Sequence, residues 1–295
     1  MAAVLKTPDV KIFFDPGLSL APRRYGLPPH PVEMEAASQL REKILLEVED
    51  ADIVTISHYH RDHYTPPYES KFEHTTENTF LEIYSGKTIL AKDYTHSINY
   101  NQRKRAYVLF KKLSDKVKEI VFADNREYII GETRIEAFLS PHGAEDSKLG
   151  WVLGFLVKVY NKPVVMYLPD VQGPISQNVL KKVLEIKPHL LVVGGPPTYL
   201  SGTKVKQKDV LKGLQNLKTL VHELKREGRQ IVISHHLLRD KEWTEILSQY
   251  GIEESNVKLY SDILNKKFTG LEAYRDILYE VEKPSSKYLQ WIQGK

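Results

Sequence analysis

The stretch His58-Tyr59-His60-Arg61-Asp62-His63 places four side chains that can bind a metal ion within six consecutive residues. It directly follows residues 52–57, an apolar, β-branched run that is typical of a short buried strand. The first two histidines are two residues apart on extended backbone, so they point to the same side and can bind one ion. A bend would direct the last Asp-His pair toward a second ion. The stretch therefore predicts a dinuclear metal site at a strand end.

Three more predicted strands, each ending at residues that can bind a metal, lie at 134–139, 163–168 and 230–234. His142 follows the first, Asp170 the second, and His235 and His236 the third. Strand ends can converge on one edge of a sheet, where functional loops gather. Because side chains alternate along a strand, we expect only one of the two adjacent histidines to bind metal. We expect this ligand to be His235, with His236 packing or acting as an acid.

Residue types restrict the chemistry of the site. The chain has no cysteine, which excludes disulfides, thiol nucleophiles, iron–sulfur clusters and thiolate zinc sites. Walker-type phosphate loops, G-x-S-x-G elbows and H-E-x-x-H helices are missing from the sequence too, so nucleotide-driven and serine-hydrolase chemistry has no support. We expect two divalent metal ions bound by nitrogen and oxygen, with zinc first and iron or manganese as alternatives.

Length and composition indicate one globular domain. The chain has 295 residues, of which 41% are hydrophobic and 27% charged, close to the averages for such domains. With no repeat and no Gly/Ser linker, we expect a single domain over residues 1–295, with a helical elaboration around 64–115. No apolar run reaches the roughly 18 residues of a membrane span, and no signal peptide is evident, so we expect a cytoplasmic protein without a membrane partner.

Periodicity predicts mixed sheets with helices on the outside. Strands are expected at 10–14, 52–57, 87–91, 117–122, 127–130, 134–139, 151–160, 163–168, 190–193 and 230–234, and helices at 37–48, 98–113, 176–186, 208–226, 241–249 and 271–281. Turn residues at Asp124-Asn125 and Gly131 divide the region 117–139 into what we interpret as antiparallel hairpins.

The order H-x-H-x-D-H, His142, Asp170, His235 resembles the metallo-β-lactamase superfamily, in its dinuclear hydrolase branch, and the chain most resembles an archaeal group within it. The resemblance implies a four-layer αββα sandwich of two mixed sheets, with the metals in a cleft at one edge. It also implies the ligand sets: His58, His60 and His142 for the first metal, Asp62, His63 and His235 for the second, and Asp170 as the bridge. Asp62 and Asp170 are thereby the expected catalytic carboxylates.

These ligands indicate hydrolysis. Two cations about 3.5–4 Å apart lower the pKa of a bridging water and supply hydroxide at neutral pH. A net charge of +4 favours a phosphodiester or another anionic substrate, either a small molecule or a nucleic acid. Ester, lactone or thioester hydrolysis is the alternative. An alternative of a different functional class is a nucleic-acid-binding module built on a metal fold that has no catalytic activity. A basic and aromatic cluster at residues 100–112 suggests this alternative.

Four residues are expected to contact the substrate. Arg103 or Arg105 would clamp a phosphate, because the planar guanidinium can bind it bidentately. Tyr199 or His236 would supply a proton to the leaving group. The alternative for the two arginines is a solvated helix face. For Tyr199 the alternative is an ordinary loop tyrosine.

Overall fold

The computed structural model describes residues 2–294. Its strands are β1 (Ala3–Lys6), β2 (Lys11–Phe14), β3 (Ile53–Ile56), β4 (Thr88–Ala91), β5 (Glu119–Phe122), β6 (Glu127–Ile130), β7 (Thr133–Pro141), β8 (Trp151–Val159), β9 (Lys162–Leu168), β10 (Leu190–Gly194) and β11 (Gln230–Ser234). Its α-helices are α1 (Pro31–Val48), α2 (Glu77–Tyr84), α3 (Tyr100–Leu113), α4 (Gln177–Ile186), α5 (Gln207–Arg226), α6 (Trp243–Gln249), α7 (Tyr260–Ile263), α8 (Arg275–Val281) and α9 (Ser286–Gln293). Short 3-10 turns cover Thr198–Leu200, Leu237–Arg239 and Glu254–Asn256.

The first sheet has the strand order β1-β2-β3-β4-β5. β1 is antiparallel to β2, and the remaining neighbours are parallel. β3 is the central strand, and all four of its residues are buried, as the continuous apolar run predicts. The ends of β2 and β3 therefore lie at the same edge of the sheet.

The second sheet has the order β11-β10-β9-β8-β7-β6. β7, β8 and β9 are antiparallel neighbours, whereas β9, β10 and β11 are parallel. β7, β9 and β11 consequently run in the same direction and end at one edge.

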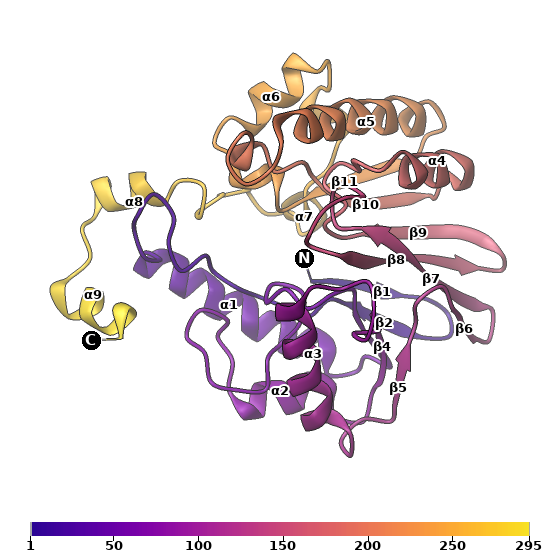
Figure 1. The fold of residues 1–295 in the computed structure, drawn as a ribbon, viewed down its shortest axis with the longest axis horizontal. Coiled ribbons are helices and arrows are strands. Elements are labelled where there is room, and N and C mark those ends of the chain that lie inside the picture. The colour runs from indigo at the N-terminus through magenta and orange to yellow at the C-terminus, as the bar shows by residue number, and fades with distance from the viewer. Residues whose placement is uncertain (1, 295) are drawn as a thin grey trace.

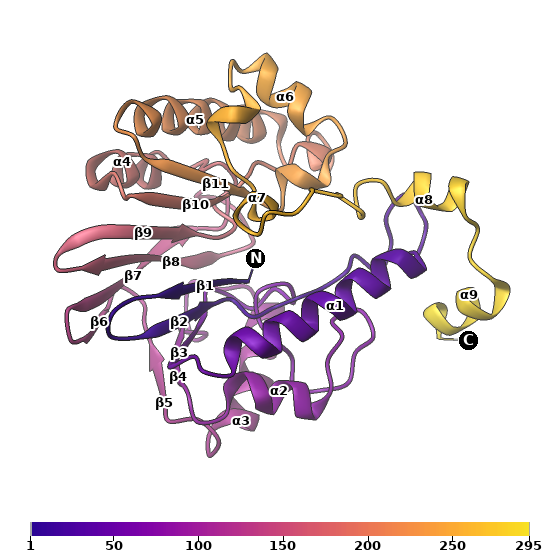
Figure 2. The same cartoon turned by 180° about the vertical axis from the view of Figure 1, so that it is seen from behind.

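The two sheets pack face to face, with helices on both outer faces (Figures 1 and 2). α1, α2 and α3 cover the first sheet, and α4, α5 and α6 cover the second. One apolar cluster, which includes Phe14, Phe155 and Tyr167, fills the space between the sheets. Each sheet also packs on its own helices through a further cluster. The predicted four-layer sandwich of mixed sheets is confirmed.

The prediction of a hairpin between residues 117–122 and 127–130 is wrong. β5 pairs with β4 in the first sheet, and β6 pairs with β7 in the second. The turn at Asp124-Asn125 thus carries the chain from one sheet to the other. Turn residues mark where a strand stops, but they do not determine which strand it pairs with.

The C-terminal segment lies beside the beginning of α1, away from the sheets (Figure 2). Its buried Arg275 makes an ion pair with the buried Glu33 of α1, with Nε 2.8 Å from Oε2, and donates to the carbonyls of Ala21 and Leu27. Tyr288 of α9 donates to the carbonyl of Pro29. Among the helices of residues 2–294, none is both long and apolar enough to cross a membrane.

Candidate metal centre

The predicted metal ligands gather from both sheets. The stretch 58–63 follows β3 of the first sheet, whereas His142, Asp170 and His235 follow β7, β9 and β11 of the second. Because these strands end at edges that face each other, four separate parts of the chain meet at one place. Asp170 itself has a φ of +47°, in the left-handed region that aspartate tolerates better than most residues.

His58, His60, His142 and Asp170 form the first group, in which one ligand atom from each lies within 4.8 Å of the others. The Nε2 atoms of His58 and His142 lie 3.2 Å and 3.1 Å from Asp170 Oδ2. His60 Nδ1 lies 3.8 Å from the same oxygen. These are the residues that the resemblance assigned to the first metal, together with the bridging aspartate.

Asp62, His63 and His235 form the second group, also with ligand atoms within 4.8 Å of one another. His63 Nε2 and His235 Nε2 lie 3.4 Å and 3.0 Å from the other oxygen of Asp170, Oδ1. One oxygen of Asp170 therefore faces each group. This is the arrangement that a carboxylate bridging two cations requires.

The polar atoms of the cluster fit a bound cation. Within residues 2–294, the buried side-chain atoms without a hydrogen-bond partner include His58 Nε2, His63 Nε2, His142 Nδ1, Asp170 Oδ1 and both ring nitrogens of His235 and His236. An unsatisfied buried polar group costs about 1–3 kcal/mol. Among these atoms, His58 Nε2, His63 Nε2, His235 Nε2 and His236 Nε2 all face Asp170. Divalent metal ions, which take imidazole and carboxylate ligands, would satisfy these atoms together.

Electrostatics favour the metal-binding protonation state at His58 and Asp170 but not at His63. Burial would lower the pKa of His63, but the nearby Asp170 and Asp62 carboxylates, with the hydrogen bond to Asp15, instead raise it to about 10. Burial lowers the pKa of His58 well below its ordinary value, and the neighbouring His63 adds to the effect. Burial alone would raise the pKa of Asp170, but the surrounding histidines outweigh it and hold that pKa well below its usual range. Neutral imidazoles and an ionised carboxylate are the forms that bind metal.

His236 lies closer to the cluster than strand alternation predicts. β11 ends at Ser234, so both following histidines lie in a turn, where the alternation of side chains no longer applies. His236 Nε2 is 3.4 Å from Asp170 Oδ1, and the two histidines with Asp170 form a third group of possible ligands. His235 Nε2 also faces Asp62, at 3.7 Å from Oδ2. The assignment of His235 as the ligand stays a prediction.

Asp15, which follows β2, supports the cluster from beneath. Its Oδ2 accepts a hydrogen bond from His63 Nδ1 at 2.8 Å, and its Oδ1 accepts one from the backbone N–H of Ser57 at 2.8 Å. The Ser57 and Tyr167 hydroxyls also donate to it. A carboxylate that holds the far nitrogen of a histidine fixes the ring and leaves Nε2 for the metal.

Arg239 lies beside the second group. Its guanidinium is 3.5 Å from Asp62 Oδ2 and 3.4 Å from a carboxylate oxygen of Glu272. Tyr199, predicted to contact substrate, lies near enough to Arg239 that, against the effect of burial, it helps Glu272 and Asp62 to raise the pKa of that guanidinium. The guanidinium of Arg24 lies over the Tyr199 ring, 4.7 Å from its centroid. Tyr199 is therefore connected to the centre through an arginine.

The two arginines predicted to clamp substrate differ in position. Arg105 donates from Nη1 to the carbonyl of Tyr59 at 3.1 Å, so it contacts the metal-binding stretch directly. Arg103 instead donates to the carbonyl of Thr95 on an exposed part of the surface. The structure brings only Arg105 to the metal-binding stretch.

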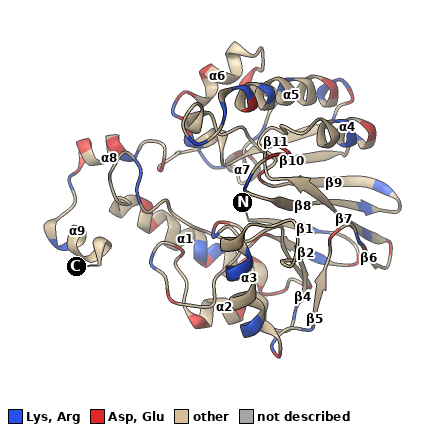
Figure 3. Cartoon of the chain, in the orientation of Figure 1, with Lys and Arg blue, Asp and Glu red and all other residues tan. Residues whose placement is uncertain are grey.

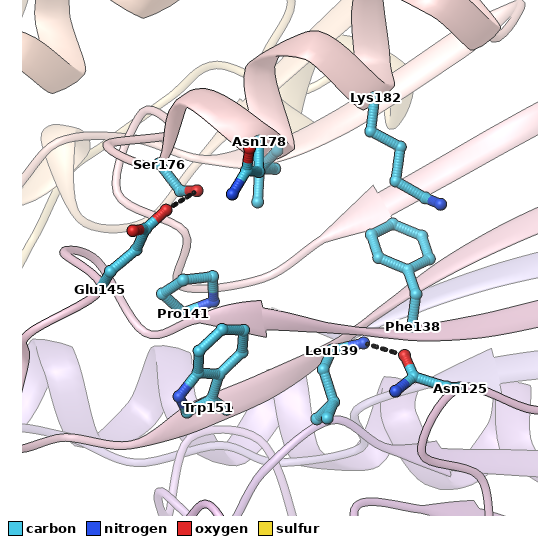
Figure 4. Close-up of a pocket in the computed structure, with 10 residues that line it drawn as sticks. Asn125, Phe138, Leu139, Pro141, Glu145, Trp151, Ser176, Asn178 and Lys182 are labelled. Carbon is cyan, nitrogen blue, oxygen red and sulfur yellow. Dashed lines mark hydrogen bonds between the residues drawn. The ribbon is translucent and has the colours of Figure 1, made fainter.

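A cavity of about 210 Å³ lies beside the loop that carries His142 (Figure 4). Phe138, Pro141 and Trp151 form its apolar wall, and Lys182 lies over the Phe138 ring. On the opposite side, Ser176 donates to Glu145. None of the described residues that line it is a predicted metal ligand, so this cavity is separate from the metal centre.

A family model described as "Beta-lactamase superfamily domain" matches residues 2–225. The chain belongs to the beta-lactamase superfamily. Within this superfamily it is 41% identical over 279 residues to a UPF0282 protein of Methanopyrus kandleri, covering 94% of each chain. It is 42% identical over 292 residues to a UPF0282 protein of Pyrobaculum islandicum, covering 96% of this chain and 90% of that one.

Among solved structures, the chain is similar to Igni18, described as a novel metallo hydrolase of Ignicoccus hospitalis. The identity is 12% and the TM-score 0.46, with coverage of 88% of this chain and 89% of that one. The superfamily match confirms the family resemblance that the sequence motif indicated.

Sequence reasoning gave no role at this beta-lactamase superfamily site to two residues, Asp15 and Arg239, although the turn Asp15-Pro16-Gly17 resembles an early strand-end turn of the family. Asp15 ends a buried strand at the edge that carries the metal-binding stretch, and that position was a usable signal. Arg239 follows the histidine pair by three residues. Its approach to Asp62 depends on the turn over Leu237–Arg239, for which the sequence has no distinct pattern.

Proposed function

We propose that the protein is a metal-dependent hydrolase that cleaves phosphodiesters with two divalent metal ions, zinc first and iron or manganese as alternatives. The observation that carries this proposal is Asp170, whose two oxygens each face a separate group of histidines. Two cations held there would polarise a phosphoryl oxygen and lower the pKa of water enough to supply a nucleophile at neutral pH.

The side chains around the metals have distinct roles in this proposal. Asp170 holds the two ligand groups together, and Asp62 completes the second group while it faces Arg239. Asp15 keeps His63 in one orientation through its hydrogen bond to Nδ1. Arg239, held by Glu272, places positive charge next to the centre, where a phosphodiester would present its negative charge.

The substrate class is supported by charge. The chain carries 42 Lys and Arg against 38 Asp and Glu, and both Arg61 and Arg239 lie next to ligand residues. A phosphodiester of a small molecule or of a nucleic acid is therefore our first choice. Esters, lactones and thioesters could be cleaved at the same centre, because two metals also stabilise negative charge on a carbonyl oxygen.

The test combines metal analysis with a substrate panel. Protein loaded with zinc, manganese or iron would be assayed on chromogenic phosphodiesters, lactones and thioesters. We expect turnover of bis(p-nitrophenyl) phosphate, and a loss of at least about 100-fold with His60→Ala, because a ligand is removed. His222→Ala, on an exposed part of α5, is the matched control and should keep full activity. A fully metallated protein that is silent on the whole panel would overturn the proposal and favour a binding module.

A further inference from the structure

A second pocket lies beside the metal-binding stretch, on the side of α3. It has a volume of about 280 Å³. Arg61, Tyr64, Pro67 and Tyr68 line it from the loop that follows β3, and Asn101, Lys104, Arg105 and Val108 line it from α3. In Figure 3 the ribbon of α3 has blue segments, which mark its Lys and Arg positions.

The lining of this pocket is strongly positive. It contains three cationic residues, Arg61, Lys104 and Arg105, and none of its described residues is a carboxylate. Arg61 pairs with Glu73 through Nη1 at 3.3 Å, but its buried Nε has no hydrogen-bond partner within residues 2–294. No ion pair of Lys104 or Arg105 occurs in that part of the chain either. Arg61 thus has one carboxylate partner, whereas Lys104 and Arg105 have none there, and a bound anion would relieve the repulsion among the three cations.

The pocket borders the metal-binding stretch, although none of its described lining residues is itself a predicted metal ligand. Arg61 lies between two predicted ligands, His60 and Asp62. Arg105 donates to the carbonyl of Tyr59 at 3.1 Å, so α3 is fixed to the same stretch of backbone. The same short stretch of backbone therefore carries predicted ligands and a cationic residue of the pocket, which puts the pocket next to the place where a substrate's reacting group would lie.

We propose that the pocket binds a second phosphate group of the substrate, one that is not cleaved. Two planar guanidinium groups can each bind a phosphate bidentately, and the Lys104 ammonium, the Asn101 amide and the tyrosine hydroxyls add further donors. Its volume lies at the lower limit for ligand sites, which suits a phosphate or pyrophosphate group rather than a whole nucleotide. The inference rests on the proposed function, because it narrows the substrate to phosphodiesters that carry an additional phosphate.

Pyrophosphate binding, measured by calorimetry on the full-length, metal-loaded protein, tests the pocket. We expect Lys104→Glu to weaken binding at this site by about tenfold or more, because a charged hydrogen bond becomes a repulsion. Lys104→Ala should have a smaller effect in the same direction. Lys111→Glu makes the same charge reversal on α3 outside the lining of the pocket, and should change the Kd less than about twofold. The His142→Ala variant removes a metal ligand and should keep the pocket's binding.

Kinetics test whether the pocket belongs to the substrate site. Two p-nitrophenyl phosphodiesters would be compared, identical except that one carries an additional phosphate. Lys104→Glu should raise the KM of the compound with the additional phosphate about tenfold more than it raises the KM of the compound without it. Equal effects on both compounds, or equal losses of pyrophosphate binding with Lys104→Glu and Lys111→Glu, would overturn the inference. If the protein binds pyrophosphate as expected but hydrolyses neither compound, the proposed function fails while anion binding by the pocket stands.

Discussion

At the scale of single residues, Asp15 illustrates how little of a metal centre consists of ligands. This carboxylate is fully buried, accepts hydrogen bonds from His63, Ser57 and Tyr167, and makes no predicted contact with metal. Asp15 directly follows β2, and its hydrogen bonds connect β2 to Ser57 at the end of the neighbouring strand β3 and to the His63 imidazole.

We expect Asp15→Ala to lower the affinity of the second ligand group for its metal ion by about 10–100-fold, because His63 loses the partner that orients its ring. Competition with a chromophoric chelator measures this affinity. Asp50→Ala removes an exposed carboxylate and serves as the control. If both variants bind zinc equally well, Asp15 has no part in positioning the ligand.

The pair His235 and His236 gives a second prediction at this scale. Both Nε2 atoms face Asp170 Oδ1, but His235 also faces Asp62. We expect His235→Ala to lose about one metal ion per chain and His236→Ala to keep both, as measured by elemental analysis. Equal losses from the two variants would contradict this division and make both residues ligands.

At the scale of elements, the turn after β2 packs directly against the metal-binding stretch. A Cβ atom added at Gly17 would overlap the backbone of Asp62, His63 and Tyr64. Only glycine allows these two loops to lie so close together.

We therefore expect Gly17→Ala to displace the metal-binding stretch and reduce the metal content of the purified protein. Gly86→Ala is the control, since a Cβ there would meet nothing within 4 Å, although its positive φ costs about 1 kcal/mol. Elemental analysis of both variants is the measurement. Normal metal content in Gly17→Ala would show that the two loops can separate without cost to the site.

Elements with long apolar patterns could be predicted from sequence, and short ones could not. The antiparallel pair β8 and β9, joined at Tyr160-Asn161, has the predicted bounds within a residue or two. α2 was missed because its eight residues lie in a polar region, and only Phe80, Ile83 and Tyr84 mark its apolar face. One helical turn of pattern is too little to distinguish a short helix from a loop.

At the scale of the whole molecule, the gathering of these residues at one place could be predicted because every predicted ligand lies in a loop that follows a strand. Strand ends can be read locally, and a right-handed parallel topology brings them to one edge. It was harder to predict from the sequence which strand each one pairs with. β5 and β6 are separated by only four residues, yet they belong to different sheets, and that choice depends on packing across the whole sandwich.

The attachment of the C-terminal segment is also a whole-molecule property. Arg275 and Glu33 are 242 residues apart in sequence and form a buried ion pair. Removing one partner leaves the other charge buried and unpaired, so we expect Arg275→Ala to lower the free energy of unfolding by about 3 kcal/mol. Urea denaturation measures the change. Arg226→Ala, on exposed α5, should stay within about 0.5 kcal/mol of the parent protein, and an equally small effect for Arg275→Ala would contradict the role of this pair.

Because the predicted ligands come from opposite sheets, we expect metal binding and folding to be thermodynamically linked. An ion held by His63 of the first sheet and His235 of the second loses its site as soon as the sheets part. With the sites saturated, each tenfold increase in free metal concentration adds about 1.4 kcal/mol per bound ion to the free energy of unfolding. The slope of that dependence is proportional to the number of ions released, so a denaturation series in metal buffers would count them.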